Sequence, residues 1–175
     1  VLNMRDPSII YDEKSGFYYA FGSDNVVIRS KDLINWTDRT TYFNTPSDAE
    51  TSEIMDFSQF KSVKSWAKTH GYNGKLFYSS VTNDRTPLAP EIVKFGDTYY
   101  LYFSLSKQKG ANESAIFCVS TENLEKAVTN KSWTDCGLVI STCGYHKGSE
   151  LSDKEKAPNA YYDESNAVHP SVLVT

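Results

Sequence analysis

Short apolar runs alternate with polar turns along this chain, and three of the runs begin with a proline. The prolines are Pro7, Pro90 and Pro170, so the spacing is 83 residues (90 − 7) and then 80 residues (170 − 90). Each proline precedes a short β-branched or aliphatic run, a composition that favours a strand. Proline cannot donate a hydrogen bond to a strand ladder, so it belongs at a strand start. A strand start repeated at a near-constant interval predicts repeated supersecondary units.

The first two copies continue alike, with a glycine turn and then an aromatic run. Gly16 precedes residues 17–21 and Gly96 precedes residues 98–103, and both runs are rich in tyrosine and phenylalanine. A glycine between apolar runs is a turn signal, and aromatic residues favour a second strand. Two further strand-like runs follow each hairpin, so the pattern predicts two four-stranded units. The strands are expected at residues 8–11, 17–21, 25–30 and from 35 onward, and then at 91–94, 98–105, 115–120 and 137–141.

Polar segments separate these units. Residues 57–70 carry apolar side chains at helical spacing before Gly71, which predicts one helix inside an insertion. Long insertions usually lie over a binding face. The expected organisation is a first unit at 1–38, an insertion at 39–87, a second unit at 88–142, a loop at 143–167 and the start of a third unit at 168–175.

One residue stands before each of the three prolines, and these residues are Asp6, Ala89 and His169. A residue that precedes proline is pushed toward extended backbone. We therefore expect all three at equivalent positions, each extended and at the mouth of a strand. A polar side chain fixed there is well placed for chemistry.

Composition narrows the classes of partner. The net charge of −4 and the pI near 5.4 argue against nucleic acid or an anionic membrane surface as a partner. No apolar run approaches the ~18 residues that a membrane helix needs. The three cysteines are too few for a disulfide scaffold or a zinc site, and buried free thiols are favoured over a bridge between Cys118 and Cys136. No signal peptide is visible; an extracellular or periplasmic location is expected, with a cytoplasmic one left open.

The pattern as a whole predicts an all-β fold. Aromatics make up 14% of the chain, and aromatic-rich repeats suit the blades of a β-propeller. Each blade needs neighbours on both sides to bury its faces, so two blades and a fraction do not make a stable protein. We therefore expect either a fragment or a second polypeptide that carries the remaining blades.

The ordered motifs resemble those of the family 43 glycoside hydrolases, in particular the arabinanases. The stretches that carry the resemblance span nearly the whole chain: residues 5–10, 17–19, 28–37, 88–92, 99–104, 112–116 and 166–170. The resemblance implies a five-bladed propeller with its sugar site at the central axis. It also implies inverting hydrolysis of α-L-arabinofuranosyl or β-D-xylosyl linkages by an acidic base, an acidic acid and a third acidic group.

Asp6 resembles the general base of that family, the alternative being an aspartate that caps a turn before proline. Inversion requires a second carboxyl group roughly 6.5–9.5 Å away. The family's general acid comes from a later blade, so the expected second polypeptide would carry it. Glu91 lies in an Ala-Pro-Glu motif in which Leu88 replaces the family's usual tryptophan, and it is interpreted as a carboxylate that lines the substrate site or supports it.

His169 departs from the family pattern, which has an aspartate that tunes the pKa of the acid. Histidine titrates near neutral pH and cannot act as a permanent anion. Three explanations stay open: histidine fills the role, Asp163 or Glu164 substitutes, or the site binds sugar and cuts weakly. The second hypothesis for the whole protein is accordingly a non-catalytic carbohydrate-binding propeller.

Further contacts to substrate are predicted around these groups. Asn166 belongs to the His169 motif, and the aromatic rings of Phe21, Tyr72 and Phe77 are candidates for stacking on sugar, with core packing as the alternative. No cofactor is required by this interpretation. A structural calcium ion at the propeller centre is left open, with ligands mostly outside this chain.

Overall fold

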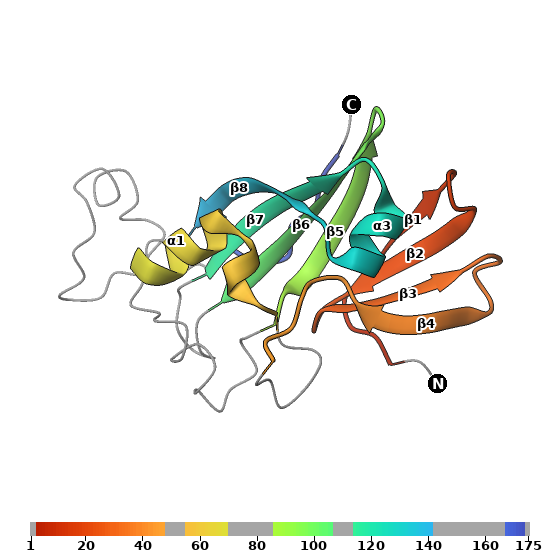
Figure 1. Cartoon of the computed structure of the whole chain (residues 1–175), viewed down its shortest axis with the longest axis horizontal. Helices are drawn as coiled ribbons and strands as arrows, with labels where there is room; N and C mark the ends of the chain where they lie inside the picture. Colours follow the sequence, from red (N-terminus) through yellow and green to blue (C-terminus); the bar gives the residue numbers. More distant parts are fainter. Residues whose placement is uncertain (1–2, 48–54, 70–85, 107–113, 142–166, 174–175) are drawn as a thin grey trace.

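The computed structural model describes residues 3–47, 55–69, 86–106, 114–141 and 167–173, which form two four-stranded antiparallel sheets (Figure 1). Strands follow the chain order within each sheet, so each strand pairs antiparallel with the next one along the chain. The first sheet contains β1 (Ser8–Asp12), β2 (Phe17–Gly22), β3 (Val26–Ser30) and β4 (Trp36–Thr41). The second sheet contains β5 (Leu88–Phe95), β6 (Thr98–Ser106), β7 (Ser114–Thr121) and β8 (Thr134–Ser141).

The all-β prediction and the eight predicted strands are confirmed. Asp12 accepts a hydrogen bond from the amide of Gly16 at 2.8 Å, which closes the first predicted turn. Strand β4 continues to Thr41, beyond the end assigned to the first unit at residue 38. This outer strand is mostly exposed and carries threonines, so its hydrophobic pattern gave no signal for its end.

Helices lie against the sheets rather than within them. The predicted insertion helix is present as η1 (Phe57–Gln59) followed by α1 (Lys61–Thr69), which packs on β8. A second helix, α3 (Leu124–Asn130), joins β7 to β8 and was not predicted. Its signal was in the sequence, because Asn123 caps the amide of Lys126 at 2.8 Å and apolar residues recur at helical spacing.

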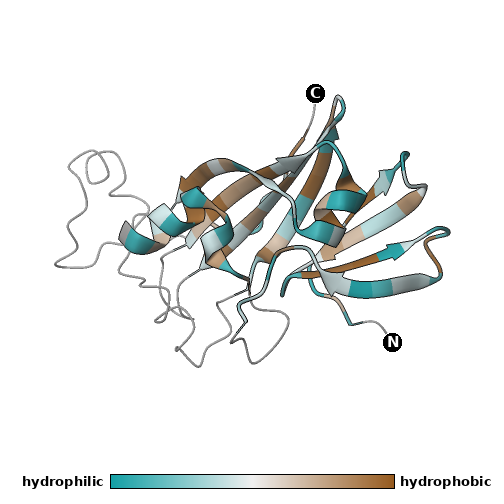
Figure 2. Cartoon of the chain, viewed as in Figure 1, coloured by the Kyte–Doolittle hydropathy of each residue, from teal (hydrophilic) through white to brown (hydrophobic). Residues whose placement is uncertain are grey.

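The main core lies between the two sheets and is rich in aromatic side chains. Phe43 contacts Phe103 at a ring-centroid distance of 4.8 Å and Phe60 at 5.1 Å. The indole nitrogen of Trp133 donates to the Tyr42 carbonyl at 2.8 Å. Figure 2 shows apolar residues concentrated along β5 to β7, the strands that this core covers. The high aromatic content of the sequence therefore serves mainly to join the sheets.

The third copy of the proline motif does not form the predicted strand within residues 167–173. A strand is defined by its ladder, and no described segment pairs with these residues. They lie beside the second sheet instead, where Ala167 donates its amide to Ser114 Oγ at 2.6 Å. Within the described part of the chain, no helix is long and apolar enough to cross a membrane.

Candidate functional site

The three residues before the prolines share an unusual backbone conformation. Asp6, Ala89 and His169 have φ angles of 49°, 42° and 59°, all in the left-handed region. The prediction of extended backbone at these positions is therefore wrong. Left-handed backbone costs a non-glycine residue about 1–2 kcal/mol, and it persists where surrounding contacts fix it.

A serine at the end of β2 supplies those contacts for two of the three residues. The Ser23 hydroxyl donates to Oδ2 of Asp6 at 2.7 Å and accepts the amide of Ala89 at 2.8 Å. Ser23 is 2% exposed, whereas the Asp6 side chain it holds is exposed. One buried hydroxyl thus joins the carboxylate of the first proline motif to the backbone of the second.

The same arrangement recurs one unit later. Ser104 in β6 donates its hydroxyl to the Leu88 carbonyl at 3.0 Å and accepts the amide of His169 at 3.1 Å. Ser23 and Ser104 each stand five residues after the first tyrosine of a Tyr-Tyr pair. Each serine therefore holds the amide before the next proline, but only Ser23 also holds a carboxylate.

The residues beside Asp6 form a second anchored group. Arg5 donates to Asp24 through Nε at 3.0 Å and through Nη2 at 2.7 Å, and Thr86 donates to the same carboxylate at 3.0 Å. The Asp24 amide donates to the Pro87 carbonyl at 3.0 Å. The segments that precede Pro7 and Pro90 are thus held together at the end of β2. The positive charge of the Arg5 guanidinium, next to Asp6 in the chain, is paired with the Asp24 carboxylate.

Similarity to known proteins now supplies a family. The profile of glycosyl hydrolases family 43 matches residues 1–151. The chain belongs to glycosyl hydrolase family 43. An extracellular endo-α-(1→5)-L-arabinanase of Thermotoga petrophila is 30% identical over 173 residues, which cover 92% of this chain and 31% of the relative. Extracellular endo-α-(1→5)-L-arabinanase 1 of Bacillus subtilis is 27% identical over 78% of this chain and 34% of its own.

Solved structures agree with this family 43 assignment. The GH43 endo-arabinanase of Bacillus licheniformis has a TM-score of 0.51 at 27% identity, over 79% of this chain and 38% of that one. The endo-1,5-α-L-arabinanase of Thermotoga petrophila has a TM-score of 0.55 at 21% identity, a likeness that concerns the fold alone. This chain spans about a third of the length of these relatives.

Within this family 43 chain, Glu91 and Phe21 occupy different environments. Glu91 lies half-buried in β5, two residues after Ala89, and its predicted contact with substrate stays a prediction. Phe21 is fully buried and packs edge-on against Tyr42 at 5.5 Å and Trp133 at 6.1 Å. The prediction that Phe21 stacks on sugar is corrected, because its ring belongs to the core between the sheets.

Five of the predicted residues lie outside the described part of the chain, namely Asn166, Tyr72, Phe77, Asp163 and Glu164. His169 is described and exposed at its left-handed position, while the role of its imidazole stays a prediction.

Among the described residues, no three His, Cys, Asp or Glu side chains gather as possible metal ligands, and the calcium ion at the propeller centre stays a prediction. Cys118 and Cys136 are both free thiols, but only Cys118 is buried, so the prediction of burial is wrong for Cys136. Burial raises the pKa of the Cys118 thiol to about 12.

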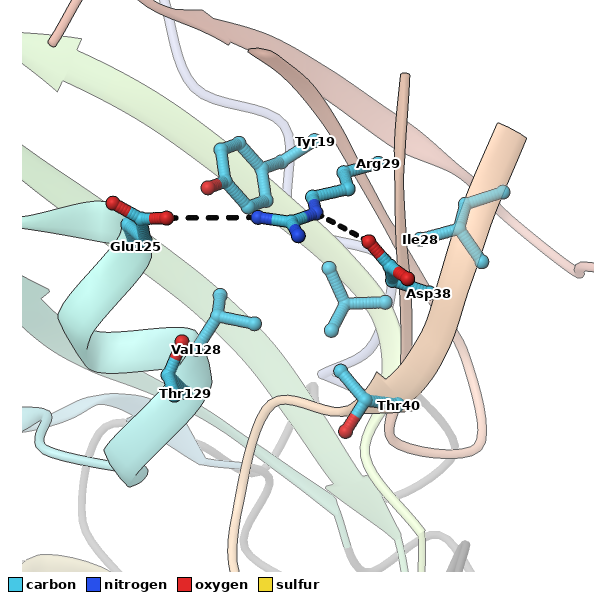
Figure 3. Close-up of a pocket in the computed structure, with 9 residues that line it drawn as sticks. Tyr19, Ile28, Arg29, Asp38, Thr40, Glu125, Val128 and Thr129 are labelled. Atoms are coloured by element: carbon cyan, nitrogen blue, oxygen red, sulfur yellow. Dashed lines mark hydrogen bonds and ion pairs between the residues drawn. The ribbon is translucent and has the colours of Figure 1, made fainter. Parts of the chain in front are cut away.

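A cavity of about 200 Å³ lies between the first sheet and α3, and Asp6 is not among the residues that line it (Figure 3). Arg29 crosses it, with Nε 2.6 Å from Asp38 and a terminal nitrogen 3.5 Å from Glu125. The positive charge of Arg29 is therefore already paired with two carboxylates of this chain. We interpret the cavity as part of the seam between sheet and helix, and Asp6 remains the centre of the candidate site.

Proposed function

We propose that the protein of which this chain is part is an inverting glycoside hydrolase that cuts α-1,5-linked L-arabinofuranosyl chains, with Asp6 as general base. The observation that carries the proposal is the anchored carboxylate in a family 43 chain. Asp6 is exposed to solvent, yet its backbone and its Oδ2 atom are both fixed.

The geometry at Asp6 suits the removal of a proton from water. Oδ2 accepts the Ser23 hydroxyl, and within the described residues Oδ1 accepts no hydrogen bond, so Oδ1 is the atom that takes the proton. The water oxygen then forms a bond to the anomeric carbon while the bond to the leaving oxygen breaks. A general acid protonates that oxygen, and in an inverting enzyme the two carboxyl groups lie roughly 6.5–9.5 Å apart.

The general acid is proposed to come from outside this chain. The two sheets represent the first two blades of a five-bladed ring, which the rest of the protein or a second polypeptide completes. Arabinan is preferred over xylan as substrate, because the relatives named above are arabinanases. Both named curated relatives are described as extracellular, which supports an extracellular location here.

A second candidate function rests on His169. It occupies the same left-handed position before proline as Asp6, but it presents an imidazole where Asp6 presents a carboxylate. A site with one carboxylate fewer at its mouth would bind arabino-oligosaccharides and release them uncut.

The test uses the full-length protein with linear α-1,5-arabinan and, in parallel, β-1,4-xylan. Proton NMR of the first minutes of reaction reports the anomer that forms before mutarotation. Arabinan cleavage that first yields the β-anomer supports the proposal. Initial release of the α-anomer overturns inversion, cleavage of xylan alone overturns the substrate, and binding of arabino-oligosaccharides without products favours the second candidate.

A further inference from the structure

We infer that Ser23 is a positioning residue for the reaction, which orients the Asp6 carboxylate and fixes it to the seam between the two sheets. The inference rests on the proposed function and adds a residue to it. We assign Ser23 no contact with the attacking water or the sugar; it affects the reaction only by orienting Asp6.

The hydrogen bonds of Ser23 leave its hydroxyl a single orientation. The hydroxyl has one proton, and this proton points to Oδ2 of Asp6 at 2.7 Å. One of its lone pairs accepts the Ala89 amide at 2.8 Å. The Ser23 amide also donates to the Arg5 carbonyl at 3.0 Å, which ties the serine backbone to the residue before Asp6. The carboxylate is therefore held by a group that is itself held from both sides.

The hydrogen bond from Ser23 to Asp6 is stronger than a bond on the protein surface, because Ser23 is buried. Ser23 and Ala89 are 2% and 8% exposed, so water does not compete for either group. A hydrogen bond to a charged acceptor is stronger than one between neutral groups. A free aspartate side chain would turn about χ1, whereas the Ser23 hydroxyl holds Oδ2 of this one at 2.7 Å.

Ser104 shows which of the Ser23 hydrogen bonds serves to join consecutive sheets and which serves to orient Asp6. Ser104 makes the equivalent bond to the amide of His169, but its proton goes to the Leu88 carbonyl. A serine at this position can therefore join one unit to the next without donating its proton to a carboxylate. The bond from Ser23 to Asp6 is the part of the arrangement that is specific to the candidate catalytic residue.

The experiment compares Ser23→Ala, Ser23→Thr and Ser104→Ala in the full-length protein, with kcat and KM on arabino-oligosaccharides and thermal unfolding of each variant. For Ser23→Ala we expect kcat to fall about ten- to a hundredfold, as misplacement of a reacting group by about 1 Å does. KM should change less than threefold. Ser23→Thr keeps the hydroxyl and should recover most of kcat, while Ser104→Ala lowers the unfolding temperature without the same loss of kcat.

A double-mutant cycle with Asp6→Asn provides the deciding measurement. If Ser23 acts through Asp6, Ser23→Ala lowers the residual rate of Asp6→Asn less than twofold, because the carboxylate to be oriented is already gone. An equal loss in both backgrounds would show a purely structural role and overturn the inference. So would a folded Ser23→Ala protein with wild-type kcat, while the loss of activity in Asp6→Asn would still support the proposed function. A wild-type protein that cuts no glycoside would overturn both.

Discussion

Replacing Tyr99 by phenylalanine removes a hydroxyl that joins the two sheets through a buried carboxylate. Tyr99 donates to Oδ1 of Asp12 at 2.8 Å, and the amides of Lys14 and Ser15 donate to the same carboxylate at 3.3 and 3.2 Å. Asp12 is 1% exposed and Tyr99 is fully buried, so water cannot replace the lost donor. A hydrogen bond to a charged group contributes about 1.5–3 kcal/mol. We expect Tyr99→Phe to lower the free energy of unfolding at pH 7 by that amount.

The loss should depend on pH in a defined direction. Burial alone would raise the pKa of Asp12, but hydrogen bonds from Ser15, Tyr99 and Lys14 outweigh burial and hold it below its usual value. A carboxylate with a lowered folded-state pKa contributes stability above its unfolded pKa of about 3.9, and that stability is lost as pH falls through the folded value. Burial, with the bond to Asp12, raises the pKa of Tyr99, so its hydroxyl stays protonated throughout.

The assay is urea unfolding of the full-length protein and the Tyr99→Phe variant at pH 7 and near pH 2.5. The difference in unfolding free energy should shrink at the lower pH, toward the about 0.5–1.5 kcal/mol of a neutral hydrogen bond. Tyr100→Phe is the matched control, since Tyr100 is half-exposed and its hydroxyl bonds to no described residue. A difference that is the same at both pH values, or below that of Tyr100→Phe at pH 7, would refute the reasoning.

Two further predictions concern the backbone around Asp6. In Gly22→Ala, the new methyl carbon would lie 2.5 Å from Met4 Cγ and 3.0 Å from the Arg5 carbonyl oxygen, so the segment that carries Asp6 must shift. We expect a loss of about 1–3 kcal/mol in calorimetry and of at least about tenfold in kcat, and wild-type values for both would contradict it. In Ala89→Gly, relief of left-handed backbone offsets the entropy that glycine adds to the unfolded chain, so stability should change by less than about 1 kcal/mol. Ala20→Gly in β2 should cost more, and an equal cost at both sites would argue against left-handed backbone at Ala89.

The sequence predicted the strands well because each one carries a local signal. Proline starts the repeat, Gly16 and Gly96 mark the turns, and a Tyr-Tyr pair begins two residues after Gly16 and three residues after Gly96. The helix at α1 was likewise visible in the spacing of apolar residues. Helix α3 was missed although Asn123 and the apolar positions after it signal a start, since its 7 residues show the helical spacing over only about two turns.

The site was harder to predict because long-range contacts decide it. The rule for residues before proline is local, and the hydrogen bonds of Ser23 and Ser104 to the next unit override it at Ala89 and His169. Ser23 itself was overlooked, although the shared offset of the two serines from the Tyr-Tyr pairs was present in the sequence. The burial of Phe21 depends on the packing of one sheet against the other, which no single strand pattern reveals.

The kcat/KM of Asp6→Asn on linear α-1,5-arabinan, measured in the full-length protein, tests most directly whether Asp6 acts as a general base in arabinan hydrolysis. Loss of a general base lowers the rate by about 10²–10⁴-fold, and we expect a loss in that range from a variant that stays folded, since the asparagine oxygen still accepts the Ser23 hydroxyl. Asp38→Asn is the control: Asp38 pairs with Arg29 at the cavity between the first sheet and α3, and this variant should retain activity within about threefold. An Asp6→Asn protein with wild-type kcat/KM would contradict the account.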